Sequence, residues 1–250
     1  MKIAIISDIH GNMEALNSVL NDIENEKCDK IFCLGDLAMA GPEPIIAIDK
    51  IKELMKSPDF EIIQGNTDEM LSAFSFDTFN KILEANEVMG NAYLADSQLL
   101  NDDYKKFLGS LNKIKEMEIL GIKILLVHGS PRKNNENIYP DLKLEEVEEM
   151  IKDTNANVIF CGHTHMPCGY QTNTEQTVIN VGSVGRPFSE NPLSCYAIME
   201  INDETGVYSV KHKLVEYDVI AASEKLRKRG FNGSEKLAQM LIKATSRYPQ

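Results

Sequence analysis

Short apolar runs alternate with amphipathic stretches over the first part of the chain. The runs are rich in β-branched residues, which is typical of strands buried on both faces of a sheet. They occupy residues 2–7, 30–36 and 60–66. The intervening segments 10–27 and 43–56 carry apolar side chains at helical spacing, and Asn12 is a suitable N-cap for the first helix. This alternation predicts a mostly parallel sheet with helices on its faces.

Residues 67–112 depart from this pattern. They combine Met, Leu and Phe in several short helical patterns and contain no clear strand. We therefore expect a helical insertion that packs over the sheet. Apolar runs typical of strands return at residues 121–131 and 157–163, on either side of an acidic helix at 142–153.

The second half of the chain predicts antiparallel hairpins followed by helices. Alternating segments are separated by the turn clusters TNTEQ and NDETG, which are typical of hairpins. Residues 218–250 carry two helical patterns, with a break at 230–233. The chain has 250 residues, 43% of them hydrophobic, and no repeat or linker divides it. We expect a single α/β domain over residues 1–250, long enough to bury one large core.

A side chain able to bind a metal follows each of five apolar runs. Ligands of α/β sheets collect outside the carboxyl ends of the strands, and side chains two residues apart can face the same way there. The candidate metal ligands are Asp8, His10, Asp36, Asn66, His128, His163 and His165. Burying seven such groups unpaired would be unfavourable, so we interpret the set as a metal site.

The histidines support this interpretation. The chain has only five, and four of them lie at these strand ends. The exception is His212, which we expect on the surface of an antiparallel strand.

Charge and cysteine content narrow the function classes. A net charge of −12 argues against binding to a nucleic-acid backbone, which relies on clustered Lys and Arg. Bound metal ions could still attract a small phosphorylated substrate. The five cysteines form no CxxC pair, and no apolar run approaches the roughly 18–20 residues that cross a bilayer. With no secretion signal evident, we expect reduced thiols, no membrane partner and a cytoplasmic location.

The order of these motifs resembles that of the calcineurin-like metallophosphoesterase superfamily. The stretches that carry the resemblance are DIHGN (8–12), GDLAMAG (35–41), GNTDE (65–69), HGSP (128–131) and GHTHMP (162–167). The closer similarity is to the prokaryotic phosphodiesterase and diadenosine-tetraphosphatase-related branch. The resemblance implies a two-sheet β-sandwich flanked by helices, with a centre of two metal ions.

The resemblance also implies two ligand sets that share Asp36. One metal ion would be bound by Asp8, His10, Asp36 and His165. The second would be bound by Asp36, Asn66, His128 and His163. Imidazole, carboxylate and amide donors without thiolate suit divalent transition-metal ions, with manganese expected first and iron, zinc or nickel as alternatives. In this family, hydrolysis proceeds by attack of a hydroxide that bridges the two metal ions.

One position departs from the family pattern. Many members carry a histidine that protonates the leaving group directly after the Gly-Asn pair, whereas this chain has Thr67 followed by Asp68. A threonine hydroxyl is a poor general acid near neutral pH. We therefore consider Asp36, Asn66 and Asp68 as candidate catalytic residues. Asp68 has the alternative roles of helix cap or partner of His10 or His165.

Three residues are candidates for substrate contact. Arg132 follows the HGSP stretch and Arg186 lies in VGSVGRPF, and a guanidinium group suits bidentate recognition of phosphate. The alternative for each arginine is a surface ion pair. Asn12 follows His10 and could reach a phosphate oxygen, although helix capping is the competing role.

Three functions are compatible with the sequence. We favour a metal-dependent phosphoesterase that hydrolyses a phosphodiester or a nucleotide polyphosphate. The first alternative is a phosphomonoesterase of the same superfamily, acting on a protein or a small molecule. The second is a non-catalytic scaffold on the same fold, like the retromer subunit. The sequence specifies neither the substrate nor the oligomeric state.

Overall fold

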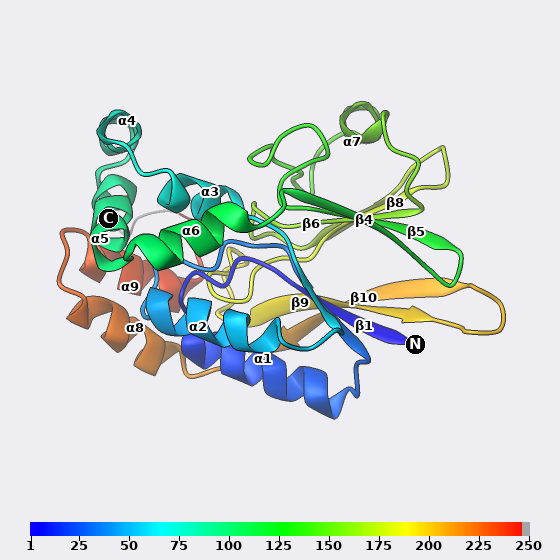
Figure 1. The fold of residues 1–250 in the computed structure, drawn as a ribbon, viewed down its shortest axis with the longest axis horizontal. Coiled ribbons are helices and arrows are strands. Elements are labelled where there is room, and N and C mark those ends of the chain that lie inside the picture. Colours follow the sequence, from blue (N-terminus) through cyan, green and yellow to red (C-terminus); the bar gives the residue numbers. More distant parts are fainter. Residues whose placement is uncertain (247–250) are drawn as a thin grey trace.

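Two five-stranded sheets stacked face to face form the centre of the molecule (Figure 1). The computed structural model describes residues 1–246. The first sheet has the order β10-β9-β1-β2-β3 and the second the order β4-β5-β6-β8-β7. The strands are β1 (Lys2–Ile6), β2 (Lys30–Cys33), β3 (Phe60–Ile62), β4 (Ile114–Ile119), β5 (Ile122–Val127), β6 (Val158–Cys161), β7 (Cys168–Gln171), β8 (Thr177–Asn180), β9 (Ser194–Ile201) and β10 (Tyr208–Val215).

Strand direction agrees with the predicted pattern in the first half of the chain and differs in the second. Strands β1, β2 and β3 are parallel, and β9 joins β1 in antiparallel register, with Lys2 opposite Glu200. The hairpins β7–β8 and β9–β10 are antiparallel, as expected. However, β5, β6 and β8 are mutually parallel, so the second half is mixed rather than antiparallel.

An apolar layer fills the space between the sheets. Ile5 and Phe32 of the first sheet are buried in one cluster with Leu126 and Phe160 of the second. His212 of β10 also spans the two sheets, because its Nε2 lies 2.7 Å from the carbonyl oxygen of Asn180. This contact makes His212 half-buried, rather than the surface residue that the sequence suggested.

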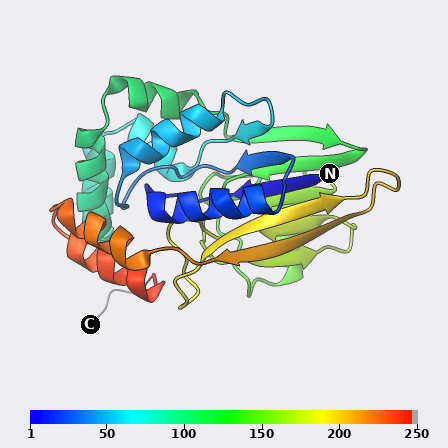
Figure 2. The ribbon, with the colours of Figure 1, turned by 90° about the horizontal axis from the view of Figure 1, so that it is seen from below.

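Helices cover the outer faces of the sandwich (Figure 2). Helices α1 and α2 lie on the first sheet, and α7 lies on the second. The side chain of Asn12 caps α1 by accepting a hydrogen bond from the amide of Ala15. The helices are α1 (Met13–Asn25), α2 (Pro44–Leu54), α3 (Asn66–Ser72), α4 (Phe76–Ala85), α5 (Glu87–Leu99), α6 (Asp102–Ser110), α7 (Leu144–Ile151), α8 (Val219–Lys228) and α9 (Ser234–Lys243).

The predicted insertion and the C-terminal helices gather at one end of the sandwich. Figure 1 shows α3 to α6, α8 and α9 beyond the carboxyl ends of β1 and its neighbours. Leu237 and Met240 of α9 share an apolar cluster with Ala92 of α5 and Leu16 of α1. From this shared core we infer one domain. Residues 247–250, which the sequence placed in a C-terminal helical segment, lie outside the described residues.

Two further features complete the fold. Strand β4 was not foreseen; it pairs with β5 in antiparallel register and exposes alternate residues. The five cysteines are free thiols. Within residues 1–246, no helix is both long and apolar enough to cross a membrane.

Candidate metal centre

The seven candidate ligands follow strands or begin a helix at the same end of the sandwich. Asp8 and His10 follow β1, Asp36 follows β2, His128 follows β5, and His163 and His165 follow β6. Asn66 is the first residue of α3. Five of the seven side chains are buried, whereas Asn66 and His163 are half-buried. The strand ends therefore bring all the predicted ligands into one region.

The facing donor atoms fall into two groups. In the first group, Asp8 Oδ1 lies 3.2 Å from His165 Nε2 and 3.8 Å from His10 Nε2. The two imidazole nitrogens are 3.2 Å apart. Donors bonded to one transition ion at about 2.1 Å are separated by roughly 3–3.5 Å. The three groups thus have the spacing of ligands around a single cation, with atoms mutually within 4.8 Å.

The second group surrounds Asn66. Asn66 Oδ1 lies 2.9 Å from His128 Nε2 and 2.8 Å from His163 Nδ1. Asp36 Oδ2 lies 3.4 Å from His128 Nε2 and 3.7 Å from His10 Nε2. Asp36 is therefore located between the two groups, which is the place that a shared ligand would occupy. Asp8, Asp36 and His128 also form a cluster able to hold a cation.

Backbone carbonyl groups fix the orientation of three imidazole rings. The Nδ1 atoms of His10, His128 and His165 lie 2.9, 2.8 and 2.6 Å from the carbonyl oxygens of Met39, Leu34 and Arg186. A carbonyl oxygen only accepts, so each Nδ1 carries the proton. In the neutral ring, each Nε2 then presents a lone pair to the centre, as metal-ligating histidines do.

The charge distribution of the centre attracts a cation. Burial opposes ionisation of Asp36, but His128 and His10 lower the pKa of its carboxyl group to about 2. Burial likewise opposes the charge on His128, yet Asp36 and Asp8 raise its pKa to about 10. Without a metal ion, a proton on His128 offsets the carboxylates. A bound divalent ion would take the place of this proton.

Within residues 1–246, Asp8 supplies a buried acceptor that has no hydrogen-bond partner. Asp8 is fully buried, and its Oδ1 receives no hydrogen bond. Its Oδ2 accepts from the backbone N–H of His163, at 3.0 Å. A buried acceptor without a donor is unfavourable unless another group satisfies it. Together with the inward-facing imidazole nitrogens, this orphan oxygen indicates that the residues fit a metal ion.

Five candidate ligands adopt left-handed backbone conformations that L-residues normally avoid. The φ angles are 56° for Asp8, 47° for His10, 56° for Asp36, 67° for His163 and 61° for His165. Such conformations cost about 1–3 kcal/mol each and cluster at functional sites. The surrounding fold therefore holds these side chains in place against local backbone preference.

Asp68 stabilises the backbone around the candidate metal ligands. Its fully buried carboxylate accepts the backbone N–H groups of Asp36, Leu37 and Gly65, at 2.8, 2.9 and 3.0 Å. Burial and the nearby Asp36 charge raise its pKa to about 6. It has no hydrogen bond to His10 or His165, contrary to one expectation. The geometry makes Asp68 a positioning residue for Asp36 and gives no support to a catalytic role.

The predicted substrate residues have different positions. Arg186 lines a cavity of about 270 Å³ over the centre, together with Thr67 and Phe188. Arg132 instead pairs with Glu136, with 2.6 Å between Nη2 and Oε1, which was the alternative considered for it.

Asn12 is fully buried and does not line the cavity over the centre. Its Nδ2 donates to the carbonyl oxygen of Gly185, at 2.9 Å, and its Oδ1 caps α1. Both polar atoms are thus used within the protein. The competing role of Asn12 as a helix cap is confirmed, and the structure gives no support to the substrate contact.

Sequence reasoning missed two supports of the centre. The ring of Phe188 stacks on that of His165, with 4.4 Å between centroids. Asp96 of α5 accepts the backbone N–H of Ala40, at 2.9 Å, within the loop that orients His10. Phe188 ends the VGSVGRPF stretch in which only Arg186 was considered, whereas Asp96 belongs to no motif and no local pattern could have identified it.

Comparisons with known proteins identify the family. A model of the calcineurin-like phosphoesterase superfamily domain matches residues 1–204. An uncharacterized protein of Methanocaldococcus jannaschii is 33% identical over 243 residues, which covers 90% of this chain and 92% of that protein.

Two solved structures have the same fold. A hypothetical protein from Pyrococcus horikoshii OT3 has a TM-score of 0.86 at 22% identity, covering 98% of this chain and 99% of that chain. A metallophosphoesterase from Sphaerobacter thermophilus has a TM-score of 0.76 at 26% identity, covering 98% and 100%. With its motifs and two-sheet fold, the chain belongs to the calcineurin-like phosphoesterase superfamily.

Proposed function

We propose that this chain is a metal-dependent phosphoesterase that hydrolyses a phosphodiester or a nucleotide polyphosphate. The observation that carries the proposal is the unpartnered Asp8 Oδ1, which faces the nitrogens of His10 and His165. Family membership supplies the reaction class. The intact donor set argues against a non-catalytic scaffold, which would not need to retain it.

Two divalent transition-metal ions would occupy the centre, with Asp36 shared between them. The first would be held by Asp8, His10, Asp36 and His165. The second would be held by Asp36, Asn66, His128 and His163. When bound, such ions activate a water molecule and neutralise phosphoryl oxygens. Nitrogen and oxygen donors without thiolate suit several divalent transition metals. Manganese is our first expectation, and iron, zinc and nickel are the alternatives.

The residue next to Asn66 favours diesters over monoesters. The Thr67 hydroxyl donates to the carbonyl oxygen of Ala38, at 3.1 Å, and its backbone N–H donates to Asp36 Oδ1, at 2.8 Å. The hydroxyl is thus already engaged and is a poor acid. Substrates with good leaving groups, such as aryl diesters or phosphoanhydrides, depend least on protonation. A phosphomonoesterase is the second candidate.

Metal content and turnover in one sample test the proposal. Purified protein should contain about two transition-metal ions per chain by elemental analysis, and it should hydrolyse bis-p-nitrophenyl phosphate with added manganese. Asp36→Asn should lower the content of both ions and abolish turnover, because one carboxylate serves both groups. Asp59→Asn is the matched control, since Asp59 pairs with Lys30 on the surface. Wild-type protein without metal and without turnover would refute the proposal.

A further inference from the structure

The cavity over the metal centre has apolar lining that the metal ligands do not account for. Within residues 1–246, three apolar side chains from distant parts of the chain line it, namely Met89, Phe188 and Met240. Met89 and Phe188 are half-buried and offer accessible surface, whereas Met240 is 5% exposed and forms part of the wall. Because Asn66 and His163 line the same cavity, a phosphoryl group bound at the centre lies next to this apolar surface.

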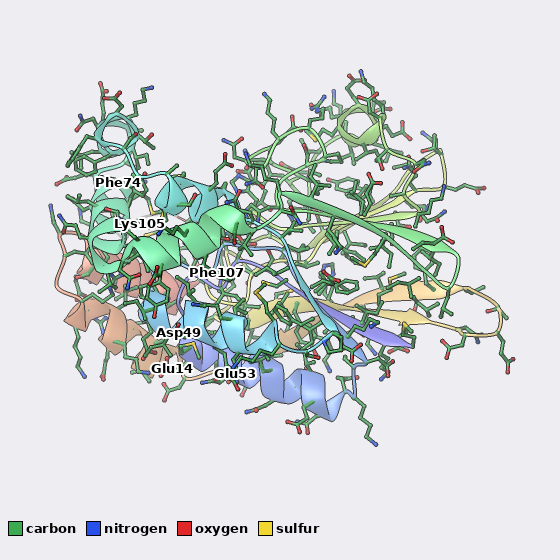
Figure 3. All side chains as sticks on the ribbon, in the orientation of Figure 1. Glu14, Asp49, Glu53, Phe74, Lys105 and Phe107 are labelled. Carbon is green, nitrogen blue, oxygen red and sulfur yellow. The ribbon has the colours of Figure 1, made fainter. Side chains whose placement is uncertain are left out.

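Contacts around α5 fix the position of Met89. Asn86 Oδ1 accepts the backbone N–H of Met89, at 3.1 Å, and caps the helix. Tyr93 follows one turn later, and its hydroxyl donates to the carbonyl oxygen of Met70, at 2.9 Å. Phe74, labelled in Figure 3, packs on Tyr93 with 5.0 Å between ring centroids. The helix is thus held at both ends of the turn that carries Met89.

The C-terminal helix α9 holds the rest of the apolar lining. Met240 belongs to α9, and the carbonyl oxygen of Ala244, its C-cap, accepts the backbone N–H of Glu190, at 2.9 Å. This bond joins the end of α9 to the loop that carries Phe188, whose ring stacks on His165. Helix α9 lies after residue 204, where the match to the family model ends. This part of the cavity is therefore an addition to the matched domain.

The size of the cavity limits what it can enclose. Its volume is about 270 Å³, whereas pockets for drug-sized ligands typically measure roughly 300–1,000 Å³. An apolar cavity of about 150 Å³ holds a benzene ring. The space over the centre therefore suits a phosphoryl group together with one ring or a short alkyl chain, and it leaves little room for a second ring.

We infer that this cavity binds one ester arm of the substrate, that the arm is a compact apolar group, and that Met89 sets its size limit. The inference rests on the proposed phosphoesterase function and assigns a chemical class to one arm of the diester. An aryl or short alkyl group gains by burial against Met89 and Phe188, whereas a longer arm would meet the wall of Met89 and Met240. Arg186, in the same lining, stays the candidate for the phosphoryl oxygens.

Phosphonates test the inference, because each carries a single arm. Titration calorimetry on manganese-loaded protein gives the Kd of methylphosphonate, phenylphosphonate and 4-biphenylylphosphonate. Wild-type protein should bind the phenyl compound about tenfold or more tighter than the methyl compound, the gain from burying one ring. It should bind the biphenylyl compound more weakly than the phenyl compound. Equal affinity for the methyl and phenyl compounds, tightest binding of the biphenylyl compound, or no binding of any of the three would overturn the inference.

Substitutions at Met89 test its role in the size limit. Met89→Ala opens the cavity, so the Kd of the biphenylyl compound relative to that of the phenyl compound should fall about tenfold, as for other single groups in a pocket wall. Met89→Leu conserves the volume and should retain the wild-type ratio. Met117→Ala is the matched control, because Met117 is a half-buried methionine on β4 that does not line this cavity. An equal fall in Met117→Ala, or no fall in Met89→Ala, would overturn the assignment of Met89.

The binding and turnover measurements separate this inference from the proposed function. If bis-p-nitrophenyl phosphate is hydrolysed while the methyl and phenyl compounds bind equally, the proposed function stands and the inference fails. If no ester is hydrolysed, the proposed function fails. The order of the three Kd values and its dependence on Met89 then still decide whether the cavity selects a compact apolar arm.

Discussion

Arg229 and Asp96 form an ion pair, with 2.6 Å between Nη2 and Oδ1, that connects the C-terminal helices to the metal centre. Asp96 is fully buried, and its Oδ2 accepts the backbone N–H of Ala40. Ala40 and Met39 have φ angles of 60° and 83°, and the Met39 carbonyl orients His10. The pair therefore stabilises a strained loop that positions a candidate ligand.

Arg229→Met should destabilise the protein strongly. Removing one partner of a buried ion pair leaves an uncompensated charge, which costs about 3–5 kcal/mol. We expect a value near the lower end, because burial already raises the pKa of Asp96 and its carboxyl group can take up a proton. Urea unfolding of the metal-free protein measures the change in the free energy of unfolding.

A second arginine, two residues earlier at the end of α8, provides the control for this prediction. Arg227 pairs with the exposed Glu235, at 2.8 Å, and exposed pairs contribute about 0–1 kcal/mol. Arg227→Met should therefore have little effect. Adding Asp96→Asn to Arg229→Met should recover part of the loss, because the amide oxygen can still accept from Ala40. Similar losses in the Arg227 and Arg229 variants would contradict the role of the buried pair.

Thr67→His should increase monoesterase activity relative to diesterase activity. Thr67 lines the cavity over the centre, so an imidazole at this position could protonate a leaving group. We expect the ratio of p-nitrophenyl phosphate to bis-p-nitrophenyl phosphate hydrolysis to rise about tenfold, a modest part of the effect of a general acid. Thr67→Val removes the hydroxyl with the same branching and should leave the ratio unaltered. An unchanged ratio in Thr67→His would show that the missing acid does not determine the preference.

Most of the fold could be predicted because apolar runs and turns are local signals. The runs before Asp8 and Asp36 mark β1 and β2, and Asn12 marks the start of α1. Strand β4 was missed because its sequence, IKEMEI, alternates charged and apolar residues at the sheet edge and follows a helical stretch. The parallel pairing of β6 with β8 was missed because register between distant strands leaves no local pattern.

The candidate ligands could be identified for a similar reason, whereas their supports could not. Polar residues stand out at the end of an apolar strand, so His128 and His163 were conspicuous. Asp96 is an ordinary polar residue within a helix, and its partner, Arg229, is 133 positions away. Likewise, the orientation of Arg132 depends on Glu136, because a side-chain pairing decides whether the guanidinium faces a ligand.

Alkylation of Cys28 and Cys168 should require unusually high pH. Burial raises the pKa of each half-buried thiol to about 11. Only the thiolate reacts, and its fraction at pH 8 is about 0.1%, compared with roughly a quarter for an ordinary thiol. The rate of iodoacetamide labelling should therefore rise about tenfold per pH unit from pH 8 to 10. Peptide mass spectrometry distinguishes the sites, with Cys28→Ser and Cys168→Ser as controls. A plateau near pH 9 would contradict the raised pKa.

Gly162→Ala should displace Asp8 and weaken binding at the first metal group. A Cβ at position 162 would lie 2.5 Å from Asp8 Oδ2 and 2.2 Å from Ser7 Oγ, closer than van der Waals contact allows. The Ser7 hydroxyl and the Asp8 carboxylate must therefore shift, which changes the position of Asp8 relative to His10 and His165. We expect manganese affinity, measured by calorimetry on metal-free protein, to fall by about tenfold or more, as for altered supports of metal ligands.

The control for this last prediction is Gly109→Ala in α6. A Cβ there would meet only the side chain of Ser72, at 3.3 Å or more, and Ala is favoured over Gly within a helix by roughly 0.5–1 kcal/mol. This variant should keep the manganese affinity and be as stable as the wild type or slightly more so. If Gly162→Ala instead binds manganese like the control, the position of the Asp8 carboxylate does not determine metal affinity. Asp8 would then have to be removed from the proposed ligand set.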